Sequence, residues 1–281
     1  MGKCRFCGGD AGFLRSSHKE CKQTHDRGIA RIRAIAGRAA LSSQTDFSIL
    51  RETLRNIASA SFIDDRLLRD LLAEAWCTAV SQALEDHVLS EDEEHALVAF
   101  KDYFSLPTDI LDKGGAYTRV AKAAILRDVL DGKIPQRVRI EGTLPFNLQK
   151  GEVLVWLFRT VRYYEPRTRT TYVGGYSGVS VRVAKGVYYR IGRFKGKPVV
   201  TTELVLLDTG ALGITDRHVY FAGEAKAFRI RYDKIVSFTP YSDGIAIQRD
   251  ALSAKPQVFV TGDGWFTYNL VTNLARLMLE G

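Results

Sequence analysis

Three cysteines and one histidine near the N-terminus constrain the fold of this chain more than any other feature of its sequence. They are Cys4, Cys7, His18 and Cys21. Each pair is separated by two residues, so a tight turn can direct both side chains at one ion. Three thiolates and one imidazole are typical ligands of a structural zinc site, and four protein ligands leave no open position for a catalytic water. The sequence therefore predicts one structural Zn²⁺ per chain.

Residues 1–41 have the pattern of a metal-binding knuckle that continues into a helix. Gly8 and Gly9 follow the first cysteine pair, as a tight turn needs, and apolar residues recur at helical spacing after the last ligand. His25 is an alternative ligand, although His18 completes the symmetric pair of pairs. A Cys-x2-Cys-Gly knuckle followed by ligands at the start of a helix resembles a treble-clef zinc finger. The resemblance implies a small module that the metal holds together.

The formal net charge of +8 is unevenly distributed along the chain. Residues 1–41 carry 9 basic and 3 acidic side chains, residues 42–131 carry 9 and 17, and residues 132–281 carry 22 and 12. Two basic segments thus flank an acidic one. We expect a polyanionic partner to contact the two ends of the chain rather than its middle.

The composition predicts a globular protein of the cytoplasm, with at most peripheral contact to a membrane. Apolar residues make up 46% of the chain, but no apolar run is long enough to span a bilayer. The N-terminus has no apolar stretch typical of a signal peptide. In a reducing compartment a cysteine cluster indicates metal binding rather than disulfides. The fourth cysteine, Cys77, lies in an apolar helical stretch and is expected to be buried.

Residues 44–131 have helical periodicity throughout and are expected to form an acidic all-α domain. Ser90 and Glu93 form a predicted capping box, and the Leu106-Pro107 step is expected to follow the end of that helix. The acidic turn, the Leu-Ser-x-x-Glu sequence and the Leu-Pro step together resemble the TerB-like (tellurite-resistance) helical family. Asp86-His87 replaces the Asp-Gly that is usual there.

The TerB-like resemblance implies a small helical bundle with a proposed divalent-cation site. The carboxylates that could serve are those of Glu85, Asp86, Glu91, Asp92, Glu93 and Glu94. Acidic residues in the first turn of a helix are also stabilised by the helix dipole without any ion. We therefore expect this acidic run to be a solvated helix face.

Residues 137–281 change to period-two patterning, with short strands separated by Gly and Asp turns and a last amphipathic helix over 267–279. This predicts a β-barrel or sandwich with a C-terminal helix, so the whole chain is expected to be an α+β multidomain protein. Lys150-Gly151-Glu152, the block 210–221 and the block 230–237 resemble bacterial pleckstrin-homology-like (PH-like) and GRAM domains. That resemblance implies recognition of a lipid or a protein rather than catalysis.

The segment at about 165–198 departs from the PH-like pattern as a basic hairpin insertion rich in glycine and tyrosine. Basic and aromatic residues on a flexible backbone suit contact with phosphates. A solvated hairpin that packs on its own barrel is the alternative. The candidate anion-binding residues here and on the N-terminal helix are Arg27, Arg31, Arg38, Arg167, Arg169, Arg190, Arg193, Lys195 and Lys197.

No catalytic motif is recognisable, so we expect a non-enzymatic protein. A hydrolase-type site would need Asp216, His218 and Asp243 to converge, although aspartates in turns usually serve the turn itself. The sequence favours a multi-module adaptor whose PH-like domain contacts an anionic membrane surface or a protein partner. This architecture is similar to that of accessory proteins in bacterial stress response or phage defence.

The alternative is a nucleic-acid-binding protein in which the knuckle, its basic helix and the basic hairpin all contact phosphates. The two hypotheses predict different arrangements of charge. Lipid recognition is expected to gather Lys150, Arg162, Arg167, Arg169, Arg190 and Arg193 around one mouth of the barrel. Nucleic-acid binding is expected to align Arg27, Arg31 and Arg38 with the hairpin.

Overall fold

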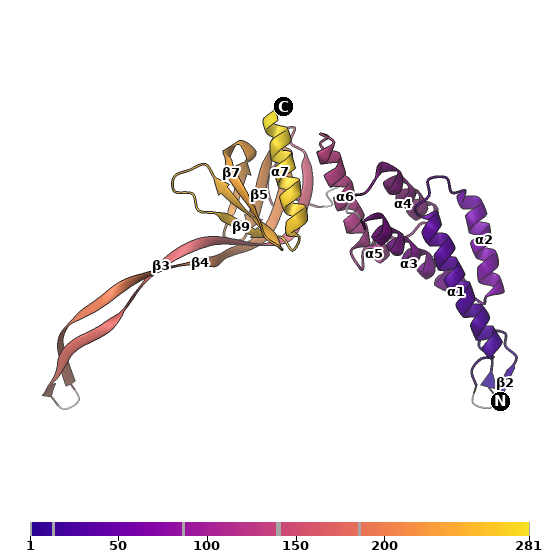
Figure 1. Ribbon diagram of the computed structural model, residues 1–281, viewed down its shortest axis with the longest axis horizontal. Coiled ribbons are helices and arrows are strands. Elements are labelled where there is room, and N and C mark those ends of the chain that lie inside the picture. The colour runs from indigo at the N-terminus through magenta and orange to yellow at the C-terminus, as the bar shows by residue number, and fades with distance from the viewer. Residues whose placement is uncertain (1, 13–14, 86–87, 139–141, 185–186, 281) are drawn as a thin grey trace. The chain divides into compact units, whose positions relative to one another are not determined.

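The computed structural model describes residues 2–12, 15–85, 88–138, 142–184 and 187–280, and it describes the backbone alone for 169–184 and 187–200. The described residues form an α+β protein with seven α-helices and nine β-strands (Figure 1). The chain divides into two compact units, Met1–Arg137 and Val138–Gly281. The first unit is mainly helical and the second is built around an antiparallel sheet.

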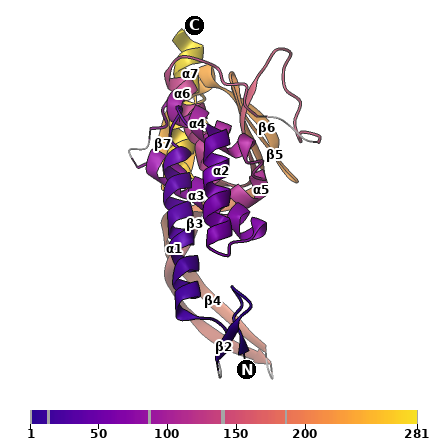
Figure 2. The same ribbon diagram turned by 90° about the vertical axis from the view of Figure 1, so that its right-hand side faces the viewer.

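The N-terminal unit consists of a small hairpin and six helices. Its elements are β1 (Gly2–Lys3), β2 (Asp10–Gly12), α1 (Lys19–Ala39), α2 (Phe47–Ala60), α3 (Asp65–Ala83), α4 (Glu91–Tyr103), α5 (Thr108–Leu111) and α6 (Ala116–Leu130). Strands β1 and β2 pair antiparallel near the N-terminal end of α1 (Figure 2). Helix α1 packs against both α2 and α3.

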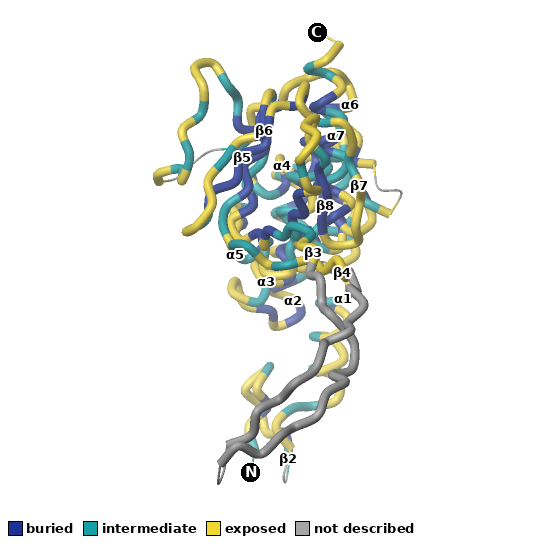
Figure 3. The backbone as a smooth tube through the Cα atoms, turned by 90° about the vertical axis from the view of Figure 1, so that its left-hand side faces the viewer, coloured by how far each residue is buried: buried dark blue, intermediate teal, exposed yellow. Residues whose placement is uncertain are grey.

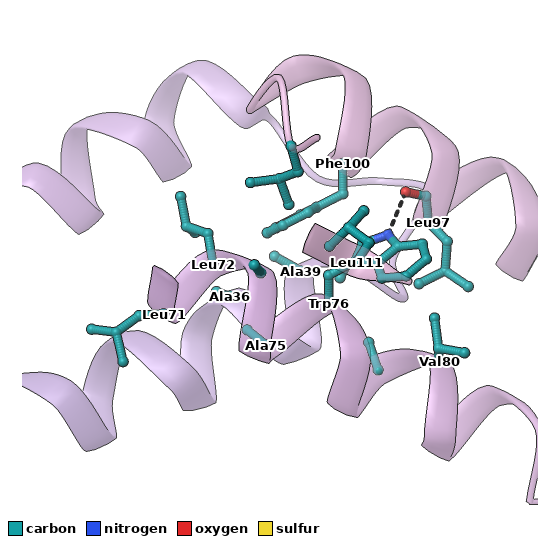
Figure 4. Close-up of a cluster of buried hydrophobic side chains, with 14 of the residues drawn as sticks. Ala36, Ala39, Leu71, Leu72, Ala75, Trp76, Val80, Leu97, Phe100 and Leu111 are labelled. Carbon is teal, nitrogen blue, oxygen red and sulfur yellow. Dashed lines mark hydrogen bonds between the residues drawn. The ribbon is translucent and has the colours of Figure 1, made fainter. Parts of the chain in front are cut away.

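One hydrophobic core joins α1 to the other helices of this unit. Ile32 and Ala36 of α1 are fully buried in the same cluster as Trp76 of α3. The indole Nε1 of Trp76 donates a hydrogen bond of 2.9 Å to the carbonyl oxygen of Leu97 (Figure 4). Burying a tryptophan requires such a partner for its N–H group. The segments 1–41 and 44–131, which differ in charge, thus pack as one unit.

The starts of three helices in this unit, α2, α3 and α4, are capped by side chains. Asp46 and Asp64 accept hydrogen bonds from the first turns of α2 and α3. At the start of α4, the Ser90 hydroxyl accepts from the Glu93 N–H at 3.2 Å, and the Glu93 carboxylate accepts from the Ser90 N–H at 3.0 Å. The predicted capping box is therefore confirmed.

A half-buried ion-pair network ties the end of the unit to α4 and α6. The Glu94 side chain, only 11% exposed, accepts hydrogen bonds from Arg127 and Arg137, each at 2.5 Å. Asp128 also accepts from Arg137 at 2.6 Å. Burial raises the pKa of Asp128, but the hydrogen bonds and charges of the two arginines outweigh burial and lower that pKa overall. Glu94 therefore stabilises the fold, and it does not belong to the solvated acidic helix face that the sequence led us to expect.

We predict that Glu94→Gln destabilises the helical unit by about 2–4 kcal/mol, because two arginines lose the charge that compensates their partial burial. Glu91→Gln is the matched control, since it removes a carboxylate from the same helical turn at an exposed position. Urea unfolding followed by far-UV circular dichroism measures both variants. Equal stability of the two variants would contradict the role of the network.

The C-terminal unit is a seven-stranded antiparallel sheet with one long helix. Its elements are β3 (Leu154–Ala184), β4 (Val187–Thr215), β5 (His218–Gly223), β6 (Ala227–Arg231), β7 (Ile235–Pro240), β8 (Gly244–Arg249), β9 (Gln257–Val260) and α7 (Gly264–Glu280). The strand order is β6-β5-β4-β3-β9-β8-β7. Helix α7 packs on β7 and β8, and most residues of β5 and β8 are buried (Figure 3).

Strands β3 and β4 are far longer than the short strands expected from the sequence, at 31 and 29 residues. Only part of each belongs to the sheet, because β3 pairs with β9 as far as Tyr164 and β4 pairs with β5 from Gly210. Beyond these residues the described pairs join β3 and β4 only to each other. We call residues 165–184 and 187–205 the arm, a two-stranded ribbon that extends away from the sheet (Figure 1).

Candidate metal centre and basic arm

The four predicted ligands lie together, two in the N-terminal hairpin and two at the start of α1. One ligand atom from each of Cys4, Cys7, His18 and Cys21 lies within 4.8 Å of the others. In a tetrahedral site with metal–sulfur bonds of about 2.3 Å, neighbouring sulfur atoms are separated by roughly 3.8 Å. The cluster therefore needs only a small contraction to hold one metal ion. Within the described residues it is the only such grouping of histidine, cysteine and carboxylate side chains.

The turn after Cys4 places the first two sulfur atoms. The Gly8 N–H donates to the Cys4 carbonyl at 2.9 Å, and the Cys4 N–H donates to the Gly9 carbonyl at 2.7 Å. Gly8 has φ of 74°, a left-handed conformation that glycine adopts without steric cost. Gly8, directly after Cys7, is thus required by this left-handed backbone conformation.

The second ligand pair is positioned by the start of α1, where His18 is the N-cap residue and Cys21 lies in the first turn. The Nε2 atom of His18 is 2.8 Å from the carbonyl oxygen of Asp10. A carbonyl oxygen can only accept, so this contact fixes the proton on Nε2 and leaves the Nδ1 lone pair free for a metal. Nδ1 lies 3.3 Å from the sulfur of Cys7 and 3.6 Å from that of Cys21.

The pKa values of the cysteines in the cluster differ. Burial raises the pKa of Cys4, but hydrogen bonds from the backbone N–H groups of Cys7, His18 and Phe6 outweigh it and bring the pKa to about 6. Burial, followed by hydrogen bonds with the sulfurs of Cys7 and Cys4, raises the pKa of Cys21 to about 11. A divalent cation favours the thiolate form of each coordinating cysteine. One thiolate is therefore already favoured before an ion binds.

His25 lies outside the ligand cluster, so it is not the alternative ligand. Its Nδ1 atom is 2.9 Å from the Ser61 carbonyl oxygen, and its ring packs on Phe6 at a centroid distance of 4.8 Å. Phe6 also contacts the ring of Phe62, at 5.9 Å. These contacts dock the knuckle onto the turn between α2 and α3.

The basic residues expected on the N-terminal helix are exposed on α1. Arg27, Arg31 and Arg38 are separated by four and seven residues, a spacing that places them along one side of a helix. Arg38 also borders a shallow groove of about 1180 Å³ between α1 and α3. Cys77 lines the same groove and is half-buried rather than buried, with its thiol 3.7 Å from the Leu111 carbonyl oxygen.

The basic residues expected in the hairpin insertion all lie on the arm. Arg167 is exposed, and for the other five the structure describes the backbone only. In the register, Arg169 pairs with Thr201, and the remaining four pair with residues of the opposite strand: Arg190 with Ser180, Arg193 with Ser177, Lys195 with Gly175, and Lys197 with Val173. Lys150 precedes β3 at the end opposite to the arm. The residues expected around one barrel mouth therefore do not share one end of the sheet.

The root of the arm is held by a buried tyrosine that sequence reasoning missed. Tyr163 is 1% exposed, and its ring packs on Phe221 and Phe259 at 5.2 Å each. Its hydroxyl donates to the Glu165 carboxylate and accepts from the Gln257 amide at 2.9 Å. Burial, then the Glu165 interaction, raises the pKa of Tyr163. Because Gln257 is remote in sequence, only the strand pairing reveals this contact.

Across the ribbon from Tyr163, Asp208 fixes the turn between β5 and β6. Its carboxylate accepts from the N–H groups of Ala225 and Lys226 at 2.8 and 2.7 Å. Burial raises the pKa of Asp208, but these hydrogen bonds outweigh it and lower the pKa overall. Both strands of the arm are thus anchored where they leave the sheet.

His218 is part of a buried polar network centred on Glu152, a residue of the Lys-Gly-Glu motif. The fully buried Glu152 carboxylate lies 2.8 Å from His218 Nδ1 and accepts from the Tyr220 hydroxyl at 2.7 Å. Asp216 instead accepts from the Val153 N–H at 2.9 Å. These contacts tie the start of β3 to the β4–β5 hairpin. The carboxylate partner of His218 is thus Glu152, and not the Asp216 or Asp243 that a hydrolase-type site would need.

Comparison with known proteins identifies no relative of this chain: no family model, curated protein or solved structure matches it. In the part of the chain that the structure describes, no helix has the length and apolar character needed to span a bilayer.

We predict that Cys7→Ser lowers the metal content from one ion per chain to less than a tenth of that, because a neutral hydroxyl replaces a thiolate ligand. Cys77→Ser is the matched control, since Cys77 is the only cysteine outside the cluster. Elemental analysis of protein purified in zinc-supplemented medium measures both. Retention of one ion by Cys7→Ser would rule out the assigned ligand set.

Proposed function

We propose that the protein is a non-catalytic, zinc-binding adaptor whose C-terminal unit contacts an anionic membrane surface through the arm. One observation carries this proposal. Residues 166–202 include eight lysines and arginines and no acidic residue. The described residues of this range lie on two strands that leave the sheet and pair only with each other in the described register. The arm therefore carries a large excess of positive charge, and its only acidic residues, Glu165 and Glu203, lie at its root.

The charge of the arm is large enough to matter for membrane binding. Each basic residue near an anionic leaflet contributes about 1 kcal/mol, and the effect falls off within a Debye length. At ~3.3 Å per residue, the 20 residues from 165 to 184 extend about 65 Å. Such a ribbon can bring several basic residues along its length to the same membrane surface.

The fold and the metal cluster support the same proposal. Seven antiparallel strands followed by one C-terminal helix agree with the PH-like plan, and such domains recognise partners rather than catalyse reactions. Three sulfur ligands and one nitrogen ligand favour zinc over harder cations, and a closed set of four favours a structural role. The zinc then stabilises the knuckle that Phe6 docks onto the helices.

Nucleic acid is the second candidate partner, and two observations favour it. A two-stranded ribbon fits the major groove of a duplex, and the arm has this form. The exposed stripe of Arg27, Arg31 and Arg38 offers further contacts to phosphates. The membrane is preferred because exposed apolar side chains lie at the root of the arm, and contacts to phosphates do not require them.

We predict that the protein binds phosphatidylserine-containing vesicles with an affinity that falls as salt rises, and that it does not bind phosphatidylcholine vesicles. Shortening the arm should weaken this binding tenfold or more, because about 1 kcal/mol per removed basic residue is lost. Since Arg169 and Thr201 are opposed, an Asn-Gly turn can join them directly and delete residues 170–200. Vesicle co-sedimentation over a salt series measures both proteins.

The same salt series with duplex and single-stranded DNA separates the two candidates. Salt-dependent binding to DNA without binding to anionic vesicles would replace the membrane proposal with the nucleic-acid alternative. Absence of binding to all these polyanions would contradict both and leave an adaptor directed at proteins alone.

A further inference from the structure

The root of the arm carries an exposed apolar patch made of two cross-strand pairs. The register opposes Tyr164 to Leu206 and Pro166 to Leu204, and we call these four residues the apolar ladder. Alternate residues of a strand lie on the same face, so both pairs belong to one face of the ribbon. The next pair on that face is Thr168 and Thr202, whose hydroxyl oxygens lie 3.4 Å apart.

The apolar ladder is exposed to a degree that is unusual for leucine. Leu204 is 52% exposed and Leu206 is 49% exposed, while Tyr164 and Pro166 are half-buried. Single exposed apolar residues are common on protein surfaces, but adjoining ones mark a contact surface. The two leucines occupy consecutive positions on one face of the same strand, so they form a continuous apolar surface.

We propose that the apolar ladder inserts into the interface of an anionic bilayer while the basic residues of the arm bind its headgroups. This inference rests on the proposed membrane function and deepens it by assigning the face that meets the lipid. Arg162 lies two residues before Tyr164 on the ladder face, 6.0 Å from the centroid of its ring, and Arg167 is exposed beside Pro166 on the opposite face. Leucine and tyrosine flanked by arginine form the pattern of an interfacial membrane contact.

Charge complementarity selects the bilayer over other occupants of this face. A second copy of the chain would bring another arm with eight basic and no acidic residues between 166 and 202 against the first, and like charges repel. Nucleic acid satisfies the charge of the arm but offers the leucines mainly charged sugar-phosphate surface. An anionic bilayer provides negatively charged headgroups for the basic residues and an apolar region below them for the leucines.

The apolar ladder is held in a defined place because the residues beside it are anchored. Tyr163 precedes the ladder and is buried, with its hydroxyl bonded to Gln257 of β9. On the other strand, Asp208 holds the β5–β6 turn two residues after Leu206. A preorganised surface loses less conformational entropy on binding than a flexible one. Insertion therefore does not require the sheet to rearrange.

The double variant Leu204→Ser with Leu206→Ser tests the inference. We expect its partition to phosphatidylserine vesicles to fall about tenfold or more, because two half-exposed leucines no longer bury apolar area. The slope of log affinity against log salt should stay unchanged, because no charge is removed. Co-sedimentation at low and high salt measures both quantities. The matched control is Val236→Ser with Leu252→Ser, which removes two exposed apolar residues of the same unit outside the ladder.

The outcomes separate this inference from the proposed function. If the unmodified protein does not bind anionic vesicles, the proposed function is wrong, and the insertion of the ladder is excluded with it. If the unmodified protein binds and the double variant binds equally well at every salt concentration, only the ladder is disproved. An equal loss of affinity in the control variant, or a parallel loss of DNA binding, would also overturn it.

A single variant gives a readout that does not depend on lost binding. In Leu204→Trp, fluorescence should be quenched by vesicles that carry bromine on the acyl chains, since the indole then reaches the bilayer interface. Leu252→Trp is the control in the β8–β9 loop and should show no added quenching over the unmodified protein. Absence of added quenching at position 204, with vesicle binding intact, would overturn the inference.

Discussion

Backbone pairing between β3 and β4 is the interaction on which the C-terminal unit depends. These two strands are neighbours near the middle of the sheet, with β5 and β6 added on one side and β9, β8 and β7 on the other. The same pairing continues beyond the sheet as the arm. A two-stranded ribbon has little stability in water by itself. The arm is therefore supported by the sheet in which both of its strands begin.

In the N-terminal unit, the small size of the hairpin limits its stability. Its hairpin of β1 and β2 is too small to bury a core, so a metal ion is the natural source of its stability. The ring of Phe6 contacts those of His25 and Phe62, and these contacts connect the hairpin to helices that have a core of their own. If an ion binds here, its removal is expected to disturb the hairpin first and to leave the helical core packed.

Local features of this structure could be predicted from the sequence because neighbouring residues determine them. The spacing of Cys4 and Cys7, the glycine after them, and the pairing of Ser90 with Glu93 each lie within a few residues. Period-two patterning likewise located most strand segments. The ion pairs of Glu94 with Arg127 and Arg137 span more than thirty residues and follow from helix packing, which no local pattern records.

The length of the arm could not be predicted for a related reason. Glycines and Pro166 and Pro198 normally interrupt strands, so the pattern favoured several short ones. A ribbon of two strands tolerates them, because one edge of each strand needs no partner. In the same way, Tyr163 could be recognised as the arm's anchor only once β9 was known to lie beside β3.

The unbroken register of the arm has a consequence for how this protein can evolve. From Tyr164 to Arg182 every residue of β3 keeps the same offset to its partner on β4. Removal of two residues from each strand would therefore shorten the ribbon and keep every outer residue on its original face. Removal of one residue from each strand would exchange the faces of everything beyond the cut. Selection can thus adjust the reach of the arm in steps of two residue pairs while the sheet that carries it stays the same.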